Sequence, residues 1–252
     1  MPPLRGLREA VGVGATSNFT NRTIQCERKN NPPAFQATPP QRGDEGFAGG
    51  VEVQITVFQL GQLGANCYIV ADEQAKTCAV VDPGGQGRQV AQWLRQEGLT
   101  PRFVFLTHGH FDHVGGVKEL AGEFPGLKVY LHPEDTKLPA EMCQGIWWSD
   151  LYEEGDEIAM DGLTFRVYHT PGHTPGSVCL QVGDVLLTGD TLFAGSCGRT
   201  DFPGGSWSQM MQSLVRLANL PGDLSVLSGH GEGSTMDAER RHNPYMKEAM
   251  KR

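Results

Sequence analysis

A histidine-rich stretch that directly follows an apolar run places the strongest constraint on how this chain can fold. The run at residues 103–106 has the continuous apolar character of a buried strand. The next stretch, residues 107–113, carries four potential metal ligands, namely His108, His110, Asp112 and His113. Imidazole and carboxylate groups beside a core are costly to bury unless each gains a partner. A bound divalent cation would partner all of them, so the sequence predicts a metal site at the end of this strand.

The composition excludes several classes of function. Among the 252 residues 38% are hydrophobic, and no apolar run reaches the length needed to span a bilayer. The formal net charge of -8 argues against nucleic-acid binding, which relies on clustered lysine and arginine side chains. We therefore expect a protein that binds neither membrane nor nucleic acid and that acts on a small molecule. The composition fixes no oligomeric state.

Six cysteines are scattered along the chain without a Cys-x-x-Cys pair. A chain of this length can bury a substantial core without disulfide cross-links. We interpret the cysteines as reduced thiols and expect a cytoplasmic protein.

Two regions of the chain differ in composition. Residues 1–50 are rich in Pro, Gly, Asn, Gln and Arg and show no sustained apolar period, which predicts a disordered extension. Over residues 51–60 apolar and polar residues alternate, as in a half-buried strand. We expect a single globular domain over residues 51–252.

Strand and helix patterns alternate through this domain. Apolar runs at residues 67–70 and 78–81 predict a strand hairpin, and the glycine-rich stretch 82–85 predicts a structural turn. Apolar residues at helical spacing predict a helix over 86–97 and another around Met210. Strands that alternate with helices are typical of a layered α/β domain.

Four predicted strands each end in a residue that can bind a metal. The strands and the residues that follow them are 103–107 with His108, 164–168 with His173, 185–188 with Asp190, and 224–228 with His230. Rigid strands would therefore position the partners of the histidine-rich stretch.

Seven candidate ligands are too many for one tetrahedral ion and suit two. One division assigns His108, His110 and His173 to a first half-site. It assigns Asp112, His113 and His230 to a second half-site, with Asp190 bridging the two. Imidazole and carboxylate groups bind zinc, iron or manganese, of which we favour zinc. Two adjacent cations would lower the pKa of a water held between them and so supply hydroxide, the nucleophile of a hydrolase.

The order of these residues resembles the metallo-β-lactamase-fold superfamily. The motif Thr-His-x-His-x-Asp-His at residues 107–113 is followed by a histidine, an aspartate and a final histidine in the superfamily's order, and all seven positions match. The resemblance covers roughly residues 51–231. It implies an αββα sandwich with the metals at one edge, between the ends of its two sheets.

Within this superfamily the chain is most similar to glyoxalase II-like thioester hydrolases. The matching stretches are residues 63–68, 81–84, 171–177, 188–193 and 197–202. Full-length glyoxalase II carries a helical C-terminal domain, whereas only 22 residues (252 minus 230) follow His230 here. The resemblance therefore implies the short bacterial subtype of hydroxyacylglutathione hydrolase, with the thiol of the substrate left open.

The resemblance also implies a mechanism and two alternatives. A bridging hydroxide, held through Asp112 and Asp190, would attack the thioester carbonyl, and a thiolate would leave. Arg199 would bind a substrate carboxylate, or would pair with Asp201 instead. A persulfide dioxygenase with a single iron has a similar motif at residues 198–202 and is the main alternative. A β-lactamase-type amide hydrolase is the weaker one.

Overall fold

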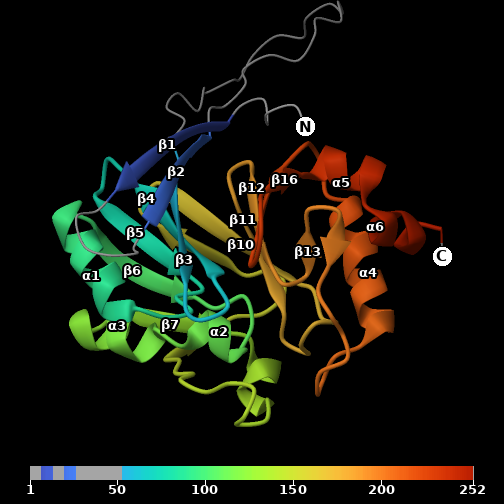
Figure 1. Cartoon of the computed structure of the whole chain (residues 1–252), viewed down its shortest axis with the longest axis horizontal. Coiled ribbons are helices and arrows are strands. Elements are labelled where there is room, and N and C mark those ends of the chain that lie inside the picture. Colours follow the sequence, from blue (N-terminus) through green and yellow to red (C-terminus); the bar gives the residue numbers. More distant parts are fainter. Residues whose placement is uncertain (1–6, 14–19, 27–52, 252) are drawn as a thin grey trace, which may run out of the picture.

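The protein is a four-layered α/β structure in which two sheets lie face to face between helices (Figure 1). A computed structural model describes the backbone of residues 7–13 and 20–26 and the whole of residues 53–251. Helices from the first half of the chain cover one sheet, and helices from its last third cover the other. The αββα sandwich that the sequence predicts is confirmed.

The first sheet has eight strands in chain order, four antiparallel pairings followed by three parallel ones. Its strands are β1 (Leu7–Val13), β2 (Thr20–Cys26), β3 (Val53–Leu60), β4 (Ala65–Asp72), β5 (Thr77–Val81), β6 (Thr100–Phe105), β7 (Lys128–Leu131) and β8 (Asp150–Leu151). Because β5 to β8 run in the same direction, their carboxyl ends open on one edge of the sheet.

The second sheet has six strands in the order β16-β15-β12-β11-β10-β9. Its strands are β9 (Glu157–Met160), β10 (Leu163–His169), β11 (Val178–Val182), β12 (Val185–Gly189), β15 (Ser225–Ser228) and β16 (Ser234–Thr235). Strands β12 and β15 are parallel, and β10 runs in their direction because two antiparallel pairings separate it from β12. A short hairpin of β13 (Leu192–Phe193) and β14 (Ser196–Cys197) follows β12.

Helices cover the outer face of each sheet. On the first sheet lie α1 (Gly87–Gln96), which matches the helix predicted over 86–97, α2 (Phe111–Val114) and α3 (Val117–Glu123), and the 3-10 helix η1 (Pro133–Lys137) follows β7. On the second lie α4 (Trp207–Ala218), α5 (Met236–His242) and α6 (Pro244–Ala249). The helix predicted around Met210 is α4, whose amino end is capped where Ser206 Oγ accepts from the Gln209 N–H. No helix in the described part of the chain is long and apolar enough to cross a membrane.

The core between the sheets is built from inward-facing apolar side chains of alternate strand positions. Phe105 of β6 and Phe165 of β10 are fully buried there, with ring centroids 4.8 Å apart. A second cluster packs the first sheet against Leu94 and Leu120 of its helices, and a third packs the second sheet against α4 and α6. From β3 onward, the central strands of both sheets are thus packed on both faces.

Residues 1–50 contain two strands where the composition predicts disorder. Strand β1 pairs with β2, and β2 pairs with β3 from Asn21 opposite Phe58 to Gln25 opposite Gln54. This pairing satisfies N–H and C=O groups that β3 would otherwise present at an unpaired edge. The disordered extension over residues 1–50 stays a prediction. The other residues of 1–50 lie outside the described part of the chain.

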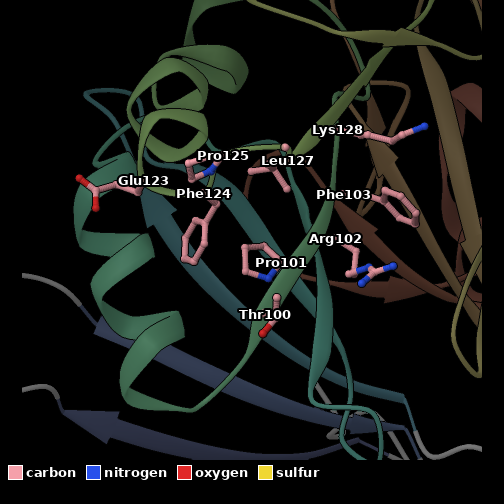
Figure 2. A pocket seen from close by; sticks show the side chains of 10 residues that line it. Thr100, Pro101, Arg102, Phe103, Glu123, Phe124, Pro125, Leu127 and Lys128 are labelled. Carbon is pink, nitrogen blue, oxygen red and sulfur yellow. The ribbon is translucent and has the colours of Figure 1, made fainter.

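A surface cavity of about 400 Å³ lies at the amino ends of β6 and β7 (Figure 2). It is lined by Thr100, Pro101, Arg102, Phe103, Glu123, Phe124, Pro125, Gly126, Leu127 and Lys128. The histidine-rich stretch follows the carboxyl end of β6, so this cavity opens on the opposite edge of the sheet.

Candidate metal centre

All seven candidate ligands come together at the carboxyl ends of the strands that precede them. His108 and His110 follow β6, and α2 carries Asp112 and His113. From the second sheet, His173 follows β10, Asp190 follows β12 and His230 follows β15. Each half-site therefore takes two side chains from the first sheet and one from the second.

The first half-site is made of three buried imidazoles. Nδ1 of His110 lies 2.8 Å from Nε2 of His173, and one ring nitrogen each of these two and of His108 falls within 4.8 Å of the others. Burial, followed by the charges of the neighbouring histidines, holds the pKa of His108 well below its ordinary value. Burial also lowers the pKa of His110 to about 3. The rings of His108 and His110 are thus neutral at physiological pH, the form that binds a metal.

The second half-site combines two imidazoles with a carboxylate. Nε2 of His230 lies 3.2 Å from Oδ2 of Asp112 and 3.3 Å from Nε2 of His113. Burial would raise the pKa of Asp112, but the hydrogen bond from His230 and the charge of His113 lower it to about 2. Burial would lower the pKa of His113, but the carboxylates of Asp190 and Asp82 raise it to about 9. The half-site thus attracts a cation, which a metal would supply in place of the proton.

Asp190 lies between the half-sites. One carboxylate oxygen is 3.6 Å from Nε2 of His173 and 3.8 Å from Nε2 of His230, and the other is 3.4 Å from Nε2 of His113. Within residues 53–251, three buried polar side-chain atoms lack a hydrogen-bond partner, and all belong to this centre: Nε2 of His108, Nε2 of His110 and Oδ1 of Asp190. A pair of divalent ions fits this donor set, because it would satisfy the buried atoms and the clustered carboxylates together.

Asp82 supports the second half-site, although the sequence predicts only a turn at this position and a match to glyoxalase II-like hydrolases, without a role for its side chain. Its carboxylate accepts hydrogen bonds from Nδ1 of His113 at 3.0 Å, from Thr107 N at 2.7 Å and from Thr107 Oγ1 at 2.6 Å. The contact leaves Nε2 of His113 facing the other ligands. Asp82 adopts a left-handed conformation with φ of 52°, and a Cβ on Gly84 would lie 1.7 Å from the carbonyl oxygen of Asp112. An aspartate in an Asp-Pro-Gly turn after a buried strand was the available signal.

Arg199 is engaged within the protein. Its guanidinium donates to both carboxylate oxygens of Asp201 at 2.7 Å and lies 3.8 Å from the ring centroid of Phe202. This is the second of the two roles that the sequence left open for Arg199. Its backbone carbonyl accepts from Nδ1 of His173 at 2.8 Å, which directs Nε2 of that ring toward the other ligands.

The sequence matches a known family over most of the domain. The family described as the metallo-beta-lactamase superfamily matches residues 60–230. The chain is 38% identical to an uncharacterized protein of Mycobacterium leprae, covering 76% of this chain and 98% of that protein. It is 33% identical to the hydroxyacylglutathione hydrolase GloC of Haemophilus influenzae, covering 77% of this chain and 96% of that enzyme.

Solved structures show the same relationship. BLEG-1, a B3 metallo-beta-lactamase, aligns with a TM-score of 0.69 at 33% identity, covering 75% of this chain and 98% of that one. TTHA1623 in a di-iron-bound form aligns with a TM-score of 0.66 at 36% identity, covering 74% and 98%. ETHE1 from Myxococcus xanthus aligns with a TM-score of 0.64 at 30% identity, covering 75% and 83%. The chain therefore belongs to the metallo-beta-lactamase superfamily, and its site is that of a metal-dependent hydrolase.

Proposed function

We propose that this protein is a thioesterase that hydrolyses S-(2-hydroxyacyl) thiols with two divalent metal ions, zinc being favoured over iron or manganese. The observation that carries the proposal is the presence of two ligand sets with Asp190 between them, within 3.8 Å of ring nitrogens of both. GloC, a relative that is covered over 96% of its length, is named as a hydroxyacylglutathione hydrolase, which supports this substrate class.

Bound ions would supply a water of lowered pKa and a Lewis acid for the substrate carbonyl. Asp112 and Asp190 would hold the ions and accept a hydrogen bond from the O–H of that water, so we assign both to catalysis. The leaving group is a thiol with a pKa of about 8.5, so it departs as a thiolate with little need for a proton donor. The site as built requires no further general acid for a thioester, whereas an amine leaving group would need one.

Two phenylalanine rings border the centre and would contact the substrate. The ring of Phe202 lies 5.9 Å from that of His110, and the ring of Phe193 lies 6.4 Å from that of His230. Apolar rings on either side suit a small acyl group and its thioester sulfur. We infer that Arg199 meets a substrate carboxylate only by leaving Asp201.

We also propose a cytoplasmic location. The cysteines of residues 53–251 are free thiols, and three of them, Cys67, Cys78 and Cys179, are buried. Burial raises the pKa of Cys78 and of Cys179 to about 12, so these thiols are inert.

A persulfide dioxygenase is the second candidate. The motif at residues 198–202, which is similar to that of such enzymes, favours it, and it would use a single iron. The likeness to BLEG-1 favours a β-lactamase activity in the same way, but the site has no evident donor for an amine leaving group.

Metal analysis of the purified protein, combined with two assays, tests the proposal. We expect two metal ions per chain and hydrolysis of S-lactoylglutathione or of another S-lactoyl thiol. Oxygen uptake on glutathione persulfide, with one iron and no thioesterase activity, would overturn the thioesterase in favour of the dioxygenase. Turnover of a chromogenic cephalosporin without thioesterase activity would favour the β-lactamase.

Asp190→Ala supplies the site-directed control. It should lose metal and turnover together, whereas Asp184→Ala, at an exposed turn between β11 and β12, should change neither. Full activity in Asp190→Ala would show that Asp190 does not bridge the half-sites.

A further inference from the structure

A buried aspartate that is not a candidate ligand joins two of the loops that carry the candidate ligands. Asp135 lies in η1 and is 1% exposed. One carboxylate oxygen accepts from Gly109 N at 2.7 Å and from Thr174 Oγ1 at 2.8 Å, and the other accepts from Gly176 N at 2.6 Å. Burial raises the pKa of this carboxyl, against the effect of the three donors. The three hydrogen bonds account for its retention in the interior.

The donors to Asp135 lie next to the candidate ligands of the first half-site. Gly109 separates His108 from His110, and Thr174 follows His173 directly. The Asp135 carboxylate therefore ties the loop after β6 in the first sheet to the loop after β10 in the second. These two loops supply the whole of the first half-site.

The contact between η1 and the His173 loop has little freedom to adjust. A Cβ on Gly176 would lie 2.6 Å from Oδ1 of Asp135, so this close approach requires glycine. Beside it, the ring of His132, which precedes η1, stacks on that of His169 at the end of β10, with centroids 4.1 Å apart. Both contacts cross from one sheet to the other.

The second half-site is supported by a different residue. Asn66 of β4 donates from Nδ2 to the carbonyl oxygens of Ser228 at 2.9 Å and of Gly231 at 3.0 Å, on either side of His230. Asn66 is 4% exposed, so these bonds are shielded from water. The two half-sites thus have separate supports in Asp135 and Asn66.

We propose that Asp135 is a positioning residue for the first half-site and sets its metal affinity independently of the second. Its carboxylate fixes the separation of the loop that carries His108 and His110 from the loop that carries His173. The proposal requires that the centre binds metal and does not depend on which substrate it hydrolyses.

Metal titration in the presence of a competing chelator tests this without any substrate. In Asp135→Asn the amide nitrogen cannot accept a hydrogen bond, so at least one donor loses its partner. We expect one of the two zinc affinities to fall by about 10- to 100-fold, as is usual when a support of a ligand is lost, while the other stays unchanged. Thr174→Val removes one of the three hydrogen bonds and should weaken the same affinity by about fivefold.

Ligand variants identify which affinity belongs to which half-site. The affinity weakened in Asp135→Asn should be the one abolished in His110→Ala, and Asn66→Ala should weaken the one abolished in His230→Ala. If the protein binds a single metal ion, its affinity identifies the half-site. Where His110→Ala abolishes that affinity, Asp135→Asn must weaken it. Where His110→Ala does not abolish it, Asp135→Asn must leave it unchanged. Equal weakening of both affinities, or of neither, would overturn the proposal.

Asp72→Asn is the matched control for a general loss of stability. Asp72 is also buried and also accepts three hydrogen bonds, all of them from backbone N–H groups, but it ends β4, at the opposite edge from the metal centre. It should lower the melting temperature and leave both metal affinities unchanged. A comparable loss of metal affinity in Asp72→Asn would mean that Asp135→Asn weakens metal binding only through a general loss of stability. That result would contradict the proposal. Absorption of the cobalt-substituted protein should change in Asp135→Asn and not in Asp72→Asn.

Discussion

Nδ1 of His113 donates a hydrogen bond to Oδ2 of Asp82 over 3.0 Å, between two side chains that are both buried. The contact selects the tautomer of His113 whose Nε2 is free to bind a metal. It also joins the turn after β5 to the histidine-rich stretch after β6. Asp82, which is not a candidate ligand, thus determines the orientation of His113, which is one.

Asp82→Ala should weaken metal binding at the second half-site by about 10- to 100-fold, because His113 loses the partner that orients it. Chelator competition measures the change. Asp161→Ala is the matched control, since Asp161 is also an aspartate with positive φ, of 49°, and accepts from a threonine hydroxyl, that of Thr77, at 2.6 Å. Unchanged metal affinity in Asp82→Ala would mean that the other ligands alone fix the ring of His113.

Arg199→Ala should leave the metal content unchanged, because the contact to His173 comes from the backbone carbonyl. The guanidinium is exposed and paired with Asp201, and exposed ion pairs of this kind contribute little to the stability of the fold. We expect KM for an S-acyl thiol that carries carboxylates to rise on the order of fivefold or less. A much larger rise, absent for an uncharged thioester, would show that Arg199 leaves Asp201 to bind the substrate.

Asp72 should make stability depend on pH. The N–H of Ala75, together with those of Gly162 and Gln74, holds the pKa of Asp72 below its ordinary value, although burial opposes this. A group whose pKa is lower in the folded state stabilises it above the unfolded pKa of about 3.9, and this contribution is lost as pH falls through the folded pKa. Urea unfolding should therefore show Asp72→Asn less stable than the wild type by about 1–2 kcal/mol at pH 7. The difference in the free energy of unfolding between the two proteins should decrease below about pH 4. A difference that does not change with pH would exclude the charge of Asp72 as its cause.

Phe165→Ala should lower the free energy of unfolding by about 3–5 kcal/mol, because the ring is fully buried against Phe105 between the sheets. Phe165→Leu keeps much of the volume and should cost less. Thermal or urea unfolding of the metal-loaded protein measures both. Equal losses in the two variants would indicate that ring contacts, and not the filled volume, hold the sheets together.

The strand ends that carry candidate ligands were predictable because local pattern and chemistry coincide there. A buried apolar run can be identified from its own residues, and the residue that follows it can be judged as a metal donor. The same reasoning gave helix α1 to within a residue at either end. Both depend on neighbours in the sequence.

The supporting residues were not predictable in this way. Asp82 acts on a side chain 31 positions away, Asp135 on groups up to 41 away, and Asn66 on a carbonyl 165 away. Aspartate and asparagine are common in turns and on surfaces, so the roles of these three side chains follow from their partners in space. Strands β1 and β2 were not predicted for a related reason, since their pairing depends on the edge of β3 and hardly on their own composition.

The division of ligands between the sheets has a consequence for the stability of the whole chain. The first sheet is complete by Leu151 and the second begins at Glu157, so the two halves of the sandwich are also two halves of the sequence. Neither half contains a full set of donors for either metal. Each bound ion would act as a cross-link between the halves, and cutting the backbone in the intervening loop would yield two fragments with a binding site only in their complex.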